Sequence, residues 1–147
     1  MSNKNKKAKK QLWHGRFRDR MDEAVSAYTA SINIDQRLGP YDIKGTRAHV
    51  RMLASQDILS EEDKKKILEG LELIDSLLQS GKLPLDDQLE DIHMNLESYL
   101  TSLVGDAGAR VHTGRSRNDQ VSTDTKLFCL DAAQNWSQLI KNLQKSL

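Results

Sequence analysis

The chain has 147 residues with nearly balanced charge, 22 basic against 21 acidic side chains, so it fits one domain. Its single cysteine, Cys129, excludes an intrachain disulfide and is consistent with a reducing compartment. The sequence contains no apolar run long enough to cross a bilayer and no secretory signal, so we expect a cytoplasmic protein without a membrane partner.

Positive charge is concentrated at the N-terminus. Residues 1–10 carry a charge of +5 from five lysines: Lys4, Lys6, Lys7, Lys9 and Lys10. Because the net charge of the chain is +1, the remaining residues carry −4. Such a tip is typical of a disordered, solubilising terminus. Binding to nucleic acid is the alternative. No aromatic side chain interleaves with these lysines, so we expect no nucleic-acid partner.

The pattern of apolar residues predicts helix after helix and an all-α fold. Apolar side chains recur at helical spacing in five segments: residues 19–31, 41–54, 60–81, 89–103 and 119–147. Gly39 and Pro40 mark the start of the second helix or a kink. Ser60 and the three acidic residues after it have the pattern of an N-cap with an acidic first turn, and Gly81 ends that helix. Residues 105–108 form a predicted turn region.

The last predicted helix differs from the others. Its apolar face runs to residue 147 without a stop signal: Val121, Phe128, Ala132, Trp136, Leu139, Leu143 and Leu147. Such a face must find partners, either other subunits or a later part of a longer protein. Cys129 lies in the same apolar pattern, and we expect it in the core rather than as a nucleophile.

Residues 110–124, R-V-H-T-G-R-S-R-N-D-Q-V-S-T-D, form the densest polar stretch. Arginine binds carboxylates in bidentate fashion, and neighbouring amides and hydroxyls fix their orientation. The turn at Gly114, followed by Asn118 and Asp119, predicts backbone amides at a helix N-terminus, which bind anions. We interpret the stretch as a loop that binds a charged ligand. A solvated basic loop is the alternative.

Polar residues also interrupt the apolar faces elsewhere. Asp91 and Asn95 are four residues apart and share one helical face, while His93 lies off the leucine stripe. Stabilisation of a helix N-terminus explains Asp91 equally well, and His93 is also consistent with an ordinary histidine. No second histidine lies at ligand spacing, so we expect no metal site. Ser31 has the pattern of a capping or turn residue.

Five motifs resemble, in the same order, those of the argininosuccinate lyase family. They are L-W-H-G-R-F at 12–17, S-I-N-I-D-Q-R-L at 31–38, Y-D-I-K-G-T-R-A-H at 41–49, E-D-I-H-M-N-L-E at 90–97 and H-T-G-R-S-R-N-D-Q-V at 112–121. The last is highly specific. Other members of the fumarase and aspartase superfamily share the fold without this string, whereas the delta crystallins, lens relatives of the lyase, carry it.

The resemblance implies a small helical N-terminal domain and the truncated start of a long central-bundle helix. Past the disordered basic tip at 1–10, which its lysines predict, the resemblance gives an N-terminal lyase domain at 11–113 and a signature loop with the start of the bundle helix at 114–147. The family's enzymes form homotetramers in which several subunits build each active site. They split argininosuccinate into arginine and fumarate without metal or organic cofactor, in arginine biosynthesis or the urea cycle.

The resemblance also implies six substrate-binding residues: Ser31, Asp35, Asp91, His93, Arg115 and Asn118. It implies that Ser31 and Asn118 contact the substrate directly. Of the two signature arginines, it favours Arg115 over Arg117 for contact with a substrate carboxylate. The other three match polar residues that line the family's cleft. A tricarboxylate that bears a guanidinium needs such a mixture of donors and acceptors.

Two catalytic segments of the family do not occur in this chain. The T-H-x-Q segment supplies the histidine near the base, and the S-S-x-M-P-x-K loop supplies the serine of proton transfer. We therefore expect no catalytic residue here, and an N-terminal lyase fragment that is inactive alone. The alternative is a non-enzymatic protein, crystallin-like or a helical assembly module, that retains only the binding surface.

Overall fold

The computed structural model describes residues 23–147. The elements are α1 (Glu23–Thr29), α2 (Ile32–Asp35), η1 (Gln36–Leu38), α3 (Gly39–Ser55), α4 (Glu61–Gln79), α5 (Ile92–Val104), α6 (Asp106–Ala109), η2 (Arg110–His112) and α7 (Arg117–Ser146). No strand occurs in residues 23–147, so the predicted all-α fold is confirmed for them. The basic tip at 1–10 and the first part of the first predicted helix lie outside the described residues.

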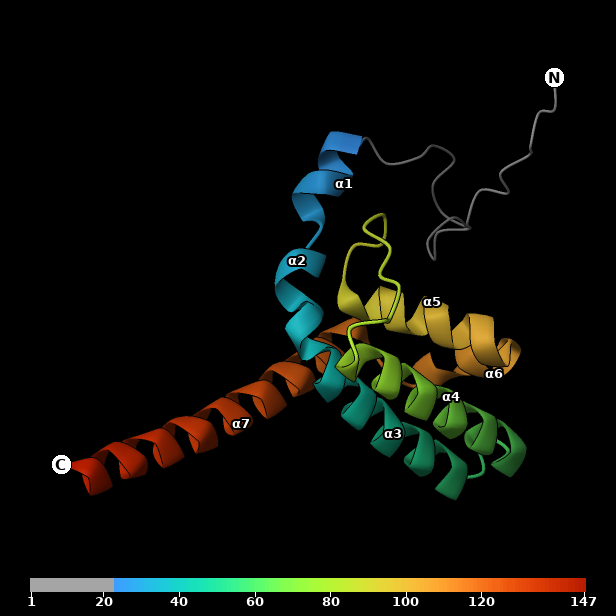
Figure 1. Ribbon diagram of the computed structural model, residues 1–147. Coiled ribbons are helices and arrows are strands. Elements are labelled where there is room, and N and C mark those ends of the chain that lie inside the picture. The colour runs from blue at the N-terminus through green and yellow to red at the C-terminus, as the bar shows by residue number, and fades with distance from the viewer. Residues whose placement is uncertain (1–22) are drawn as a thin grey trace.

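The core lies between α3, α4 and α5, which Figure 1 shows gathered on one side of the molecule. The side chains with almost no exposed surface come from all three helices: Ile43, Val50, Ile67, Ile74, Ile92 and Leu100. Burial of each such side chain contributes roughly 1.5–3 kcal/mol to folding. The short helix α6 packs on α5 and α4, and the first part of α7 packs along α3.

The ends of α3 and α4 follow the sequence signals. Pro40 lies in the first turn of α3, so Gly39 and Pro40 mark a helix start rather than a kink. Ser60 Oγ accepts a hydrogen bond from the backbone N–H of Asp63 at 3.1 Å and caps α4. Gly81 follows the end of α4 with a φ of +67°, a conformation that favours glycine.

Three predicted boundaries differ from the structure. The first predicted helix does not continue to residue 31, because the backbone N–H of Ser31 donates to the carbonyl of Glu90 at 2.8 Å and the chain restarts as α2. The helix expected from residue 89 begins only at Ile92, since Asp91 is its N-cap. The expected turn at 105–108 contains the one-turn helix α6.

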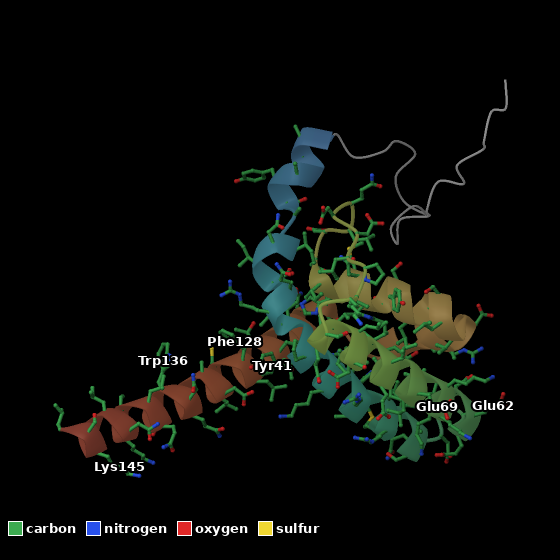
Figure 2. The ribbon with its side chains drawn as sticks, in the orientation of Figure 1. Tyr41, Glu62, Glu69, Phe128, Trp136 and Lys145 are labelled. Atoms are coloured by element: carbon green, nitrogen blue, oxygen red, sulfur yellow. The ribbon has the colours of Figure 1, made fainter. Side chains whose placement is uncertain are left out.

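The later part of α7 leads away from the other helices (Figure 1). Figure 2 shows its last aromatic anchor, Phe128, against Tyr41, with the ring centroids 5.9 Å apart in an edge-to-face arrangement. Beyond it Trp136, Leu139 and the other large apolar side chains are exposed, as expected for a face whose partner lies elsewhere. Cys129 is exposed too, so its predicted core position is wrong: the apolar pattern there does not face the core.

Among the described residues, no helix combines the length and the hydropathy needed to span a membrane.

Substitution of Gly108 by alanine is expected to destabilise the chain. A Cβ atom at Gly108 would lie 2.7 Å from Cα and 2.9 Å from N of Thr101 on α5, and backbone cannot rotate aside. We expect Gly108→Ala to lower the free energy of unfolding by roughly 1–3 kcal/mol, measured by urea denaturation.

Gly70→Ala is the matched control, because its Cβ would meet only the side-chain ends of Leu100 and Val104. These ends can change rotamer, so the loss at Gly70 should be smaller. Equal losses for the two variants would contradict a backbone clash at Gly108.

Candidate functional site

The start of α7 is fixed by local interactions. Gly114 has a φ of +66° and supplies the turn that precedes the helix. Ser116 and Asp119 then form a capping box: Ser116 Oγ accepts from backbone N–H groups of the first turn, and Asp119 Oδ2 accepts from the N–H of Ser116 at 2.9 Å. With the helix start fixed, Gln120 and Asp124, four residues apart, point from one face of α7 into the protein.

These two side chains complete a group that we call the buried polar cluster: Asp42, Thr46, His93, Arg115, Gln120 and Asp124. Gln120 Nε2 donates to Asp42 Oδ1 at 2.6 Å, joining α7 to α3. Thr46 Oγ1 donates to the same oxygen at 3.2 Å. Arg115 Nη1 donates to Thr46 Oγ1 at 3.0 Å, with Nη2 3.9 Å from Asp42 Oδ1. One oxygen of Asp42 therefore has several positive or donor neighbours.

His93 lies between two carboxylates in the buried polar cluster. Its Nδ1 atom is 3.4 Å from Asp42 Oδ2 and 3.5 Å from Asp124 Oδ2. His93 is 2% exposed and Asp124 is fully buried. Neither contact is aligned well enough to satisfy hydrogen-bond geometry, so His93 Nδ1 and both oxygens of Asp124 have no hydrogen-bond partner within the described part of the chain. Such unpaired burial is costly for a carboxylate.

The cluster shifts the pKa of its three titratable members. Burial, together with the negative charge of Asp42, raises the pKa of Asp124 to about 6. Burial opposes the charge on His93, but the adjacent carboxylate of Asp42 and the charge of Asp91 outweigh it and raise the pKa of His93. For Asp42, burial is outweighed by His93, Gln120 and Arg115, so its pKa is lowered. Of the two carboxylates, Asp42 therefore stays ionised and Asp124 is the more easily protonated.

A second set of polar residues surrounds the N-terminus of α5. Ser31 Oγ donates to Asp35 Oδ2 at 2.5 Å, and Asp35 Oδ1 accepts from the N–H of Ile92 at 3.1 Å. Asp91 Oδ1 accepts from the N–H of Met94 at 2.6 Å and caps the helix. Carboxylates at this end of a helix are stabilised by its dipole, so the structural interpretation of Asp91 is confirmed.

Arg117 links this second set to the start of α7. Its Nε atom is 3.8 Å from Asp91 Oδ2, and its Nη2 atom is 3.6 Å from Glu97 Oε2. Nη1 donates to Gln120 Oε1 at 3.0 Å, which connects Arg117 to the buried polar cluster. The Arg117 side chain is 29% exposed, against 7% for Arg115.

The six predicted substrate-binding residues thus fall into three places. Ser31, Asp35 and Asp91 meet at the N-terminus of α5, and His93 and Arg115 lie in the buried polar cluster. Asn118 is exposed on the first turn of α7, and within residues 23–147 no hydrogen bond joins its side chain to the other five. The guanidinium of Arg115 is already held by Thr46 and lies close to Asp42. Whether these six bind substrate stays a prediction.

Sequence reasoning missed Asp42, Thr46, Gln120 and Asp124. The sequence holds a signal for two of them, because Asp42 and Thr46 are four residues apart and continue the buried face of α3 that includes Val50. A polar pair at core spacing needs buried partners. The sequence does not say which ones, because the partners lie on α5 and α7.

Two hollows lie near these residues. A cavity of about 20 Å³ beside His93 is lined by Asp42, Glu97 and His112 among others, and it has room for about one water molecule. A wider surface groove of about 680 Å³ is lined by residues 84–89 and one side of α5. None of the six predicted residues lines that groove, so it does not belong to the predicted site.

Asp42, His93 and Asp124 are also the one set within residues 23–147 whose donor atoms converge as metal ligands do, within 4.8 Å of one another. The guanidinium of Arg115, 3.9 Å from Asp42, would repel a cation. The arrangement favours charge balance within the protein over a bound metal.

Asp124→Asn should weaken the pH dependence of stability. The pKa of Asp124 is about 6 in the folded chain, against an ordinary value of 3.8. Between pH 3.8 and pH 6 the folded chain therefore binds more protons than the unfolded chain. Its stability falls as the pH rises through 6. His93 acts in the same direction, because the stability from its raised pKa is present below 6.5 and lost as pH rises through the raised value.

The measurement is urea unfolding at pH 5 and pH 8. From pH 5 to pH 8 the free energy of unfolding of the wild-type chain should fall by on the order of 1 kcal/mol more than that of Asp124→Asn. Asp131→Asn, an exposed carboxylate on the same helix, is the control and should resemble the wild type. An equal loss in Asp124→Asn and the wild type would contradict a raised pKa at Asp124.

The comparisons with known proteins agree on one family. The model of a family described as lyase matches residues 15–147. Argininosuccinate lyase from Oleidesulfovibrio alaskensis is 48% identical over 92% of the chain, and that from Neisseria gonorrhoeae is 49% identical over 92%. Argininosuccinate lyase from Polynucleobacter asymbioticus is 47% identical over 99%. The chain spans about 30% of the length of these relatives.

Proposed function

The chain belongs to the lyase family whose model covers residues 15–147, and on that basis we propose that it is the N-terminal part of an argininosuccinate lyase. The proposed reaction of the whole protein is β-elimination, which splits argininosuccinate into arginine and fumarate. The observation that carries the proposal is the identity of 48% with a protein of that name over 92% of the chain. It favours a lyase over the crystallin-like alternative.

The polar residues supply the donors and acceptors that such a substrate needs. The carboxylates of Asp35 and Asp91 suit the guanidinium, and the hydroxyl of Ser31 suits either end of the substrate. Asn118 and the arginines before it suit the substrate carboxylates. We retain Arg115 as a proposed carboxylate ligand and add Arg117, because Arg117 is the more exposed of the two.

Proton transfer is proposed to come from other parts of the whole protein. The T-H-x-Q segment and the S-S-x-M-P-x-K loop of the family have no counterpart in residues 1–147. We propose that the described residues bind substrate without acting as base or acid, and that the whole protein needs no cofactor. A homotetramer is proposed too, with the exposed apolar side chains of α7 as support. A role in arginine biosynthesis or the urea cycle and a cytoplasmic location are parts of the same proposal.

A chimera tests the proposed function. Residues 1–147 replace the matching N-terminal part of the Neisseria gonorrhoeae argininosuccinate lyase, and fumarate release from argininosuccinate is followed by ultraviolet absorbance. We expect an active chimera. An assembled, folded chimera that releases no fumarate would contradict the proposal.

Asn118→Ala in the chimera tests one proposed contact. Loss of a hydrogen bond to a charged group costs about 1.5–3 kcal/mol, so kcat/KM should fall by about tenfold or more. Ser122→Ala is the matched control, because Ser122 is also exposed and lies one turn further along α7. An Asn118→Ala chimera as active as the Ser122→Ala chimera would remove Asn118 from the site.

A further inference from the structure

We propose that Asp42 and Asp124 are positioning residues for His93: a carboxylate from α3 and one from α7 hold the imidazole of α5 at Nδ1 and fix its tautomer and orientation. Neither carboxylate is among the six predicted substrate-binding residues. The inference rests on the proposed function only for the contact of His93 with substrate. The holding of the ring itself is a property of this chain.

The first argument is the chemistry of the atoms that meet. Nδ1 of His93 has a carboxylate oxygen on each side, at 3.4 Å from Asp42 and 3.5 Å from Asp124. An ionised carboxylate offers only lone pairs, so a ring nitrogen that also presented a lone pair would be repelled by both. A proton on Nδ1 turns both contacts into attractions, shared between two acceptors. Nδ1 is therefore the protonated nitrogen when the ring is neutral.

The second argument is that the two carboxylates are held differently. Asp42 Oδ1 accepts from Gln120 and Thr46, which leaves Oδ2 to face the ring. Asp124 has no hydrogen-bond donor within the described residues, and His93 is the group its Oδ2 approaches. Asp42 is thus the carboxylate whose orientation toward the ring is fixed by hydrogen bonds. Asp124 is a fully buried acid for which the imidazole supplies the compensating charge or proton.

The third argument is steric. Gly45 lies on α3 beside the carboxylate from α7, and a Cβ there would be 3.3 Å from Asp124 Oδ1 and 3.7 Å from Arg115 Nη2. Absence of a side chain at this position lets α7 approach α3 closely enough for Asp124 to reach the ring. The helices are thus packed so that the contact with His93 is made.

Fixing the Nδ1 proton decides what the other ring nitrogen does. Nε2 is an acceptor in the neutral ring and a donor in the imidazolium. Carboxylates elsewhere in proteins fix histidine tautomers in this way. The raised pKa of His93 extends to higher pH the imidazolium form, in which Nε2 also carries a proton. Asp42 and Asp91 raise the pKa of His93 and Arg117 lowers it. Asp124 also faces the ring, and Arg115 lies behind Asp42.

Nuclear magnetic resonance of the whole chain tests the proposal. Two-bond proton–nitrogen correlations in ¹⁵N-histidine-labelled protein report the tautomer and the titration of each of the four histidines. The signals of His93 are assigned by elimination with His14→Gln, His49→Gln and His112→Gln. At a pH above its titration, wild-type His93 should be the Nδ1–H tautomer.

Asp124→Asn and Asp42→Asn should each lower the pKa of His93, by about one pH unit for the larger effect. Asp131→Asn, exposed on α7, is the control and should leave it unchanged. A purely structural role predicts no change of tautomer or titration in a variant that stays folded. An Nε2–H tautomer in the wild type overturns the proposal, and so does a titration that neither variant moves.

The wild-type tautomer is read without any substitution in the cluster, so the test holds even where a variant fails to fold. It also requires no catalysis. An Nδ1–H tautomer together with an inactive chimera ends the proposed function and keeps this inference. An Nε2–H tautomer in the chain together with an active chimera overturns this inference and keeps the proposed function.

Discussion

An imidazole between two buried carboxylates joins the three helices on which the candidate site is built. Asp42 belongs to α3, His93 to α5 and Asp124 to α7, and both contacts to the ring are within 3.5 Å. In a buried environment of low dielectric such contacts are strong when charges and protons match and costly when they do not. Together with the Tyr41–Phe128 ring pair, this cluster therefore sets the direction of α7 relative to the N-terminal helices.

The positions of the other polar residues follow from that direction. With α7 packed along α3, Arg117 at its start reaches Asp91, the N-cap of α5, and Glu97 on α5. The N-terminus of α5 is capped by Asp91 and also receives Asp35 from α2. Two helix N-termini, with their caps, thus lie near one arginine. This arrangement can bind a ligand that carries both anionic groups and a cationic one.

Features that depend on neighbours in sequence were predictable. The N-cap at Ser60, the start of α3 at Gly39 and the glycine after α4 use interactions within one turn. The all-α class follows from the spacing of apolar residues. Resemblance to a known family predicted Asp91 and His93 as site residues, but did not indicate what they contact.

Features that depend on distant segments were not predictable from local patterns. The first predicted helix breaks because Ser31 bonds to Glu90, 59 residues away in sequence. The carboxylates of the buried polar cluster come from three helices, so no single helical stripe reveals them. Cys129 was expected in the core because its neighbours in sequence are apolar. It is exposed instead, because at this position α7 extends away from the packed helices. Each difference has a tertiary contact, or the lack of one, as its cause.

A double-mutant cycle between His93→Gln and Asp124→Asn tests most directly whether this cluster holds α7 to the N-terminal helices. The free energy of unfolding is measured by urea denaturation for the wild-type chain, both single variants and the double variant. We expect a coupling energy of about 1 kcal/mol or more, since the second substitution removes a contact that the first has already broken. Additive losses, within about 0.3 kcal/mol, would show that the two side chains act independently and would contradict the account.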